Sequence, residues 1–197
     1  MARLRAVPTA PGDGVFFAGP AEFEAWLSEH ADTADELWIR FAKKATGIAS
    51  LDWAGAVEVA LCFGWIDGQV RRVDDSWHLQ RFTPRRPKST WAKLNRVKVE
   101  KLIAEGRMRP RGLAEVERAK ADGRWDAAYD PPSTAAVPAD LAAALTAAQA
   151  RATFDALDSR NRFAVLHRIQ RTKTPAGRAK AIERLVNLIA SGGKPYP

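Results

Sequence analysis

The feature that most constrains the fold is a pair of apolar, strand-like segments separated by a short polar turn. The first segment, residues 65–73, is rich in Trp, Ile and Val, and the second, residues 77–82, alternates side-chain character along its length. Residues 74–76 between them are two aspartates and a serine, which favour turns. Strands connected this closely pair antiparallel. The sequence therefore predicts a β-hairpin and a small antiparallel sheet.

Helices and a further strand are predicted on both sides of this hairpin. Apolar side chains recur at helical spacing after Pro20, and residues 37–41 are apolar enough to form a buried strand. Ser50 and Ser89 are residues of the type that caps a helix N-terminus. We therefore expect one helix to begin after Ser50, and another to run from Ser89 to about Gly106.

Changes in composition divide the chain into four segments. Residues 1–13 contain prolines and glycine and read as a flexible N-terminal segment, whereas residues 14–130 hold the predicted sheet and its helices. Residues 131–137 form a linker that begins with two prolines. Residues 138–192 show only helical patterns, starting with the Ala-rich segment 138–156. The predicted fold class is α+β: a small antiparallel sheet with flanking helices, followed by a C-terminal helical unit.

Familiar catalytic and cofactor-binding motifs are absent from the sequence. It contains no P-loop, no dinucleotide-binding glycine pattern, no zinc-protease motif and no serine-hydrolase elbow. Its three histidines are far apart and it has one cysteine, so no metal site and no cofactor are expected. No apolar run approaches the roughly 18 residues of a membrane span, so membrane insertion is not expected. The single cysteine and the N-terminus without a secretory h-region predict a cytoplasmic location.

Three residues are candidates for catalysis, and whether the protein is an enzyme stays open. Cys62 and His78 are of the types that serve as nucleophile and base. However, Cys62 stands between apolar residues near the end of a predicted buried helix, which favours a structural role. Asp67 lies in an otherwise apolar segment and, if buried, needs a partner. It is either a structural ion-pair residue, or a general acid or base, or a ligand anchor.

Positive charge is concentrated in the middle of the chain. Residues 1–70 carry 5 Lys and Arg against 10 Asp and Glu, whereas residues 71–125 carry 16 against 7. The segment 81–101 alone holds eight basic residues and one acidic residue. Such a segment suits phosphate groups, nucleic acid or acidic small molecules, and a solvated basic surface is the alternative. A nucleic-acid-binding module would combine it with three arginines of the C-terminal unit: Arg160, Arg168 and Arg171.

The leading hypothesis is a small-ligand pocket between the hairpin and the helix predicted to begin at Ser89. Aromatic rings would stack on an anionic or aromatic ligand, arginines would neutralise it, and an aspartate would orient the arginines or accept a hydrogen bond. Trp26, Trp38 and Trp53 lie on apolar faces and are assigned to the core. The predicted lining residues are Trp65, Asp67, Trp77, Arg81, Phe82, Arg85, Ser89 and Trp91. Nucleic-acid binding is the alternative hypothesis, and a protein-interaction role is a further one. The oligomeric state is left open.

Several stretches together resemble a known family. They are EFEAWLSEH, ELWIRFAKKATG, ALCFGWIDG, RFTPRRPKSTWAKLN, EVERAKADGRWDAAY and RTKTPAGRAKAIERLV. In these stretches the chain is similar to the bacterial YdeI/OmpD-associated family, also described as bacteriocin-protection proteins. The resemblance implies an association with resistance to antimicrobial peptides or stress. It brings no established reaction and no catalytic residues, and the absence of a visible signal peptide departs from the members described as periplasmic.

Overall fold

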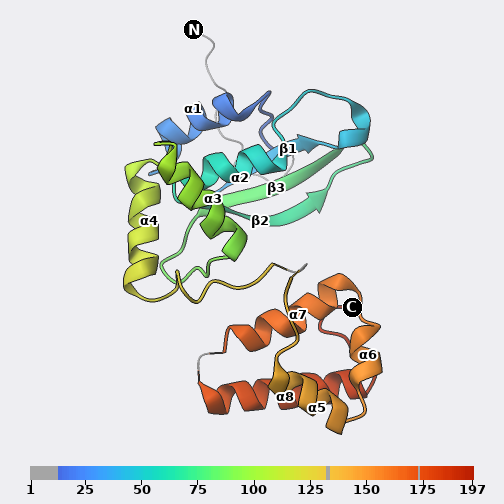
Figure 1. The fold of residues 1–197 in the computed structure, drawn as a ribbon. Coiled ribbons are helices and arrows are strands. Elements are labelled where there is room, and N and C mark those ends of the chain that lie inside the picture. Colours follow the sequence, from blue (N-terminus) through green and yellow to red (C-terminus); the bar gives the residue numbers. More distant parts are fainter. Residues whose placement is uncertain (1–12, 132–133, 173) are drawn as a thin grey trace. The chain divides into compact units, whose positions relative to one another are not determined.

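The computed structural model of the protein describes residues 13–131, 134–172 and 174–197. The predicted N-terminal segment 1–13 therefore lies almost wholly outside the described residues, and so does part of the predicted linker 131–137. What is described forms two units, which we treat separately (Figure 1). The first contains a sheet and helices and the second only helices, which confirms the predicted α+β class.

The first unit is built on a three-stranded antiparallel sheet. Its strands are β1 (Leu37–Ala42), β2 (Trp65–Arg72) and β3 (Trp77–Pro84), in the order β1-β3-β2. Strands β2 and β3 are the two arms of the predicted hairpin. Asp67 pairs with Phe82 and Val70 pairs with Gln80, so β2 carries one extra residue in between, which makes a β-bulge.

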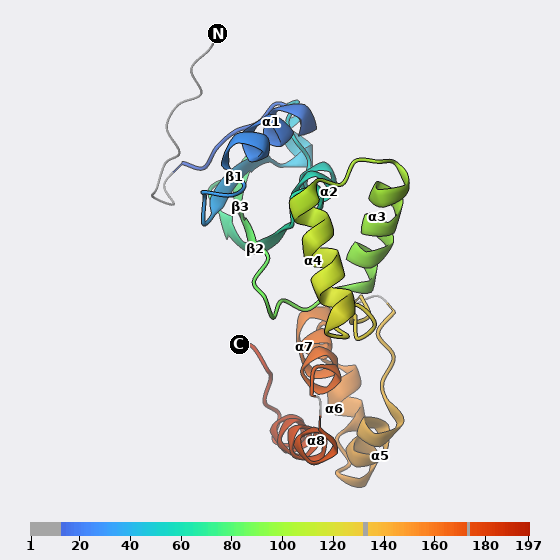
Figure 2. The ribbon, with the colours of Figure 1, turned by 90° about the vertical axis from the view of Figure 1, so that its left-hand side faces the viewer.

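One face of this sheet is covered by two helices, α1 (Pro20–His30) and α2 (Trp53–Cys62). Along β1, buried residues alternate with half-buried ones, as the two-residue period of a strand requires. Phe23 and Trp26 of α1 stack edge-on against aromatic rings of the strands, so the covered face is the core face. Figure 2 shows α1, α2 and α4 on one side of the sheet. No α-helix of the first unit, as far as it is described, covers the other side.

Two predicted helix starts are corrected by the structure. Helix α2 is capped by Asp52 and not by Ser50, because the Asp52 carboxylate accepts a 2.7 Å hydrogen bond from the backbone N–H of Gly55. The next helix, α3 (Lys93–Ala104), begins four residues after Ser89. The hydroxyl of Ser89 instead accepts a hydrogen bond from the backbone N–H three residues earlier and closes a turn.

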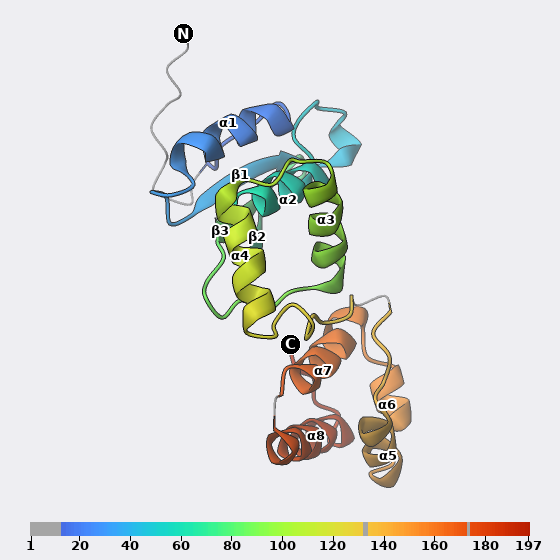
Figure 3. The same ribbon diagram turned by 60° about the vertical axis from the view of Figure 1, so that its left-hand side comes forward.

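Helix α4 (Pro110–Ala121) follows α3, and Figure 3 shows the two as an antiparallel pair. It approaches the end of α2 very closely at Gly112. A Cβ atom added at Gly112 would lie 2.2 Å from the carbonyl oxygen of Cys62. The same carbonyl accepts a 3.0 Å hydrogen bond from the backbone N–H of Arg109, so the start of α4 is attached to the end of α2.

The second unit contains helices α5 (Ala139–Ala147), α6 (Arg151–Asp155), α7 (Ser159–Gln170) and α8 (Pro175–Ala190). The Ala-rich segment forms two helices because the chain turns at Gln149, which has a φ of 52°. Residues from all four helices form one apolar core: Leu141, Leu145, Ala150, Phe154, Val165, Leu166, Ile169, Ile182, Leu185, Val186 and Ile189.

Three residues from earlier in the chain, Ala92–Leu94, belong to the second unit. Ala92 forms an isolated parallel bridge with Tyr129, and the Lys93 ammonium lies 2.5 Å from the Asp130 carboxylate. At the other end of the chain, the backbone N–H of Tyr196 donates to the Asn161 side chain. Among the helices that the structure describes, none is long and apolar enough to cross a membrane.

Candidate functional site

The structure places the predicted lining residues in three separate locations. Trp65 and Phe82 are in the core of the first unit, each with 0% of its surface exposed. The Trp65 indole donates to the carbonyl of Ala31 at 3.3 Å and packs edge-on against Trp26. Both rings are buried in contacts within the first unit and leave no surface for a ligand. Their positions therefore differ from the predicted role as pocket-lining residues.

Trp77 and Arg81 lie on the opposite face of the sheet, because odd-numbered residues of β3 point away from the core side where Phe82 packs. The guanidinium of Arg40 lies over the Trp77 ring, 4.5 Å from its centroid. The Arg81 guanidinium forms an ion pair with Glu36 at 2.5 Å. These two side chains therefore cannot share a pocket with residues that approach the core face.

The remaining predicted residues meet at the end of the sheet. The indole of Trp53 donates a 3.2 Å hydrogen bond to the Asp67 carboxylate, and the positive charge of Arg85 acts on the same carboxylate. Arg85 is buried and its guanidinium lies 3.6 Å from the centroid of the Trp91 ring. Arg85 thus links the other two residues, through its charge to Asp67 and through its ring contact to Trp91, and the helix predicted to begin at Ser89 is not part of this arrangement.

Sequence reasoning missed a second loop, which follows α4. The Arg124 guanidinium donates a 2.8 Å hydrogen bond to the backbone carbonyl of Ser89, and Trp125 packs edge-on against Trp91 at 4.9 Å. The available signal was an arginine and a tryptophan directly after the helix-ending Gly123. Trp53, assigned to the core from its helical spacing, is 49% exposed.

We call the five residues Trp53, Asp67, Arg85, Trp91 and Arg124 the arginine–tryptophan corner. It combines an exposed end at Trp53 with a buried end where Trp91 is 2% exposed and the side chain of Arg124 is 10% exposed. The Trp91 indole N–H and one terminal nitrogen of Arg124 are buried there without a hydrogen-bond partner. Buried donors of this kind are rare in proteins and favour an acceptor group beside them.

Burial raises the pKa of the Asp67 carboxyl above its ordinary value of 3.8, while the hydrogen bond from Trp53 and the charge of Arg85 act in the opposite direction. A carboxyl with a raised pKa in the folded state stabilises the fold at low pH, and this contribution is lost as the pH rises through the folded pKa. The corner therefore holds an acid whose ionisation works against folding.

Asp67→Asn is expected to stabilise the protein relative to the wild type increasingly as the pH rises from about 3.5 to 7, because the amide cannot ionise. Urea unfolding across this range measures the difference in unfolding free energy. Asp74→Asn should show the opposite trend: hydrogen bonds from the backbone N–H groups of Ser76 and Trp77 lower the pKa of Asp74. A difference for Asp67→Asn that shrinks with rising pH would contradict the assignment.

Cys62 is not activated as a nucleophile. Burial raises the pKa of its thiol to about 11, which leaves almost none of it as thiolate at neutral pH. His78, the base proposed with it, stacks on Phe41 with ring centroids 5.5 Å apart. Across the described ranges there is no group of three or more side chains able to hold a metal ion.

The basic segment 81–101 does not present its charges freely. Five of its eight basic residues lie within 4.0 Å of a carboxylate: Arg81, Lys93, Arg96, Lys98 and Lys101. Arg85 is buried in the corner. The segment therefore supplies fewer free cations than its composition suggests.

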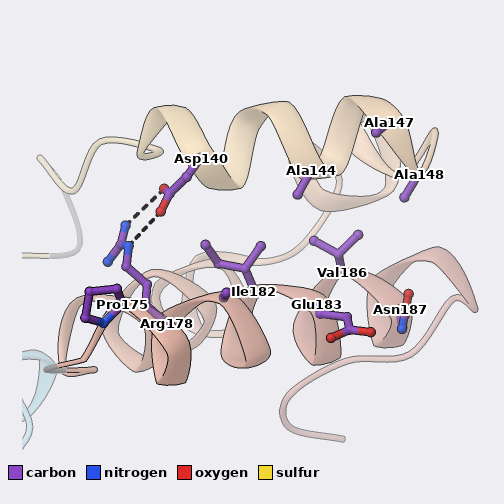
Figure 4. A pocket seen from close by; sticks show the side chains of 11 residues that line it. Asp140, Ala144, Ala147, Ala148, Pro175, Arg178, Ile182, Glu183, Val186 and Asn187 are labelled. Atoms are coloured by element: carbon purple, nitrogen blue, oxygen red, sulfur yellow. Dashed lines mark hydrogen bonds and ion pairs between the residues drawn. The ribbon is translucent and has the colours of Figure 1, made fainter.

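The second unit has a shallow groove of about 720 Å³ between α5 and α8 (Figure 4). Its floor is apolar, since alanines of α5 lie opposite Ile182 and Val186 of α8. One end is closed by an ion pair in which Arg178 approaches the Asp140 carboxylate to 2.6 Å. The groove follows from the small side chains of α5, which leave the α8 surface partly uncovered.

Comparisons with known proteins match two family models to separate parts of the chain. Residues 15–115 match the family model described as a domain of unknown function, DUF8412. Residues 134–192 match the family described as "Bacteriocin-protection, YdeI or OmpD-Associated", which confirms the family resemblance for this part of the chain. No curated protein and no solved structure matches the chain.

Proposed function

Starting from a chain that belongs to the DUF8412 family and carries a YdeI/OmpD-associated segment, we propose that its first unit binds a small anionic ligand at the arginine–tryptophan corner. Trp53 offers a half-exposed ring for stacking, and Asp67 accepts a hydrogen bond from the ligand. Arg85 and Arg124 supply positive charge and donors to its acidic group.

One observation carries this proposal. The buried donors of Trp91 and Arg124 have no acceptor among the described residues, although each belongs to a side chain that is at least nine-tenths buried. Tryptophan and arginine only donate hydrogen bonds, so the missing partner has to be an acceptor. A carboxylate or phosphate oxygen fits this chemistry and also the positive charge of Arg85, whereas the charge of Arg124 is shared with Asp122, whose carboxylate lies 2.7 Å from Arg124 Nε.

Intrinsic tryptophan fluorescence during titration with a panel of anionic and aromatic metabolites tests the proposal at two salt concentrations. We expect saturable quenching by one chemical class, weakened about tenfold or more in Trp53→Ala and in Asp67→Asn. Arg72→Ala, an exposed change at the far end of β2, is the matched control and should bind normally. The absence of a saturable response throughout the panel, or unchanged affinity in both corner variants, would refute the proposal.

The mixtures of protein and ligand from this titration also show whether the corner catalyses a reaction. If NMR of the bound mixture shows chemical conversion that is lost in Asp67→Asn, the corner is an active site in which Asp67 transfers a proton. If the ligand is recovered unchanged, the function is binding alone.

We further propose that this binding acts in the cytoplasm in protection against bacteriocins, which the family description of residues 134–192 names. Cell fractionation tests the location. The role in protection is tested by exposing bacteria that express the wild type or Asp67→Asn to a bacteriocin and comparing their survival. Equal survival would mean that ligand binding at the corner does not contribute to protection.

A further inference from the structure

The face of the sheet that no described α-helix of its unit covers carries aromatic and basic side chains together. Trp38 of β1 and Trp77 of β3 both lie on it and are half-buried. The guanidinium of Arg71 lies 4.6 Å from the centroid of the Trp38 ring, and Arg40 is placed similarly over Trp77. Phe16, 44% exposed, packs edge-on against Trp77. We call this surface the outer sheet face.

The outer sheet face has an excess of positive charge. Arg81 is neutralised by Glu36, whose carboxylate also accepts a hydrogen bond from the Trp38 indole at 3.3 Å. Arg40 and Arg71 have no carboxylate within ion-pair distance among the residues described. Asp74 is the nearby acid, but its carboxylate is occupied by backbone N–H groups of the hairpin turn. Arg40 and Arg71 thus lie over aromatic rings without a direct carboxylate contact, while the charge of Arg40 acts on the Asp74 carboxylate at longer range.

The strand register fixes the distance between the two tryptophans. Trp38 pairs with Arg81, and Trp77 pairs with Ala42, which is four residues further along β1. At about 3.4 Å per residue, the two ring positions are separated by roughly 14 Å along the strand. One small planar ligand does not reach both rings, whereas a flexible chain with repeated rings and repeated negative charges does.

We propose that the outer sheet face binds single-stranded nucleic acid, with bases stacked near Trp38 and Trp77 and phosphates held by Arg40 and Arg71. Stacking platforms beside arginines are how proteins bind single strands without reading their sequence. Bases inside a duplex are already stacked on each other and cannot lie on a sheet surface. This surface lies on the other side of the sheet from the core face, so the inference does not rest on ligand binding at the corner.

Fluorescence anisotropy with a labelled oligothymidylate of about 20 nucleotides, at about 50 and 200 mM salt, tests the proposal. We expect binding that weakens with added salt, and a loss of about 5- to 100-fold in Trp77→Ala. Arg71→Ala should also weaken binding. It should reduce the slope of log affinity against log salt concentration by about one. Lys180→Ala, an exposed charge removal in α8, controls for net charge and should change little.

Three outcomes would overturn the proposal. They are no binding at the lower salt concentration, equal losses in Arg71→Ala and Lys180→Ala, and equal affinity for a duplex of the same length. Concentration-dependent self-association that is lost in Arg71→Ala would show that the face binds a second copy of the chain instead. Asp67→Asn should leave oligonucleotide binding unchanged, so failure at the corner and failure at the outer sheet face are distinguishable.

Discussion

Trp65→Ala is expected to lower the unfolding free energy of the first unit by about 3–5 kcal/mol, the range measured for truncating large buried aromatic side chains. The indole is completely buried, packs edge-on against Trp26 and donates to the carbonyl of Ala31. Its removal leaves a cavity and an unsatisfied carbonyl acceptor. Because a domain is typically stable by only about 5–15 kcal/mol, this loss brings the unit close to unfolding at room temperature.

Urea unfolding of the complete chain, followed by far-ultraviolet circular dichroism, measures this loss. Trp53→Ala is the matched control, because it removes the same side chain from a position that is 49% exposed. We expect the control to cost about 1 kcal/mol or less, the net value of one hydrogen bond and a partly exposed surface. Equal shifts in the two variants would show that Trp65 is not a core residue.

Gly112→Ala is expected to destabilise the first unit by about 3 kcal/mol or more, at the upper end of what overpacking costs. The added methyl group would lie 2.2 Å from the Cys62 carbonyl oxygen and 2.9 Å from that of Leu61. Both are backbone atoms, so no side-chain rotation relieves the clash and α4 has to move away from α2. Helix propensity alone predicts the reverse sign, since alanine is favoured over glycine inside a helix by about 1 kcal/mol.

Thermal unfolding separates these two expectations. Gly19→Ala is the control, because Gly19 has an extended backbone and an added Cβ meets nothing within 4 Å. We expect the melting temperature of Gly19→Ala to stay close to that of the wild type and that of Gly112→Ala to fall by several degrees. A melting temperature that rises in Gly112→Ala would mean that the helices separate easily at this point.

Much of the fold could be predicted from the sequence because it is encoded locally. The alternation along β3 and the polar turn before it fix the hairpin, and the structure keeps both arms close to their predicted ends. The helix that follows was predicted too early because Ser89 has the right chemistry for a cap. Trp91 instead belongs to the core with Trp125, and this long-range packing keeps the preceding loop out of the helix.

The candidate site was less predictable, for two physical reasons. The alternation of β3 already sends Arg81 and Phe82 to opposite faces, so a pocket that includes both residues conflicts with the strand period. Arg124, by contrast, reaches the corner through a contact that spans 35 residues, and no local pattern encodes such a contact. The exposure of individual tryptophans could not be predicted either. Trp53 and Trp65 are chemically identical, and only the folded chain shows that Trp53 is exposed and Trp65 is buried.

The burial of the single cysteine has a practical consequence for labelling. With a thiol pKa of about 11, Cys62 is almost entirely in the thiol form at pH 7, and its sulfur is buried. Maleimide probes should therefore not react with Cys62 in the folded protein. Lys180→Cys and Gln69→Cys together would then introduce one reactive thiol in each unit, and the distance between two spectroscopic probes attached to them would measure the separation of the units in solution.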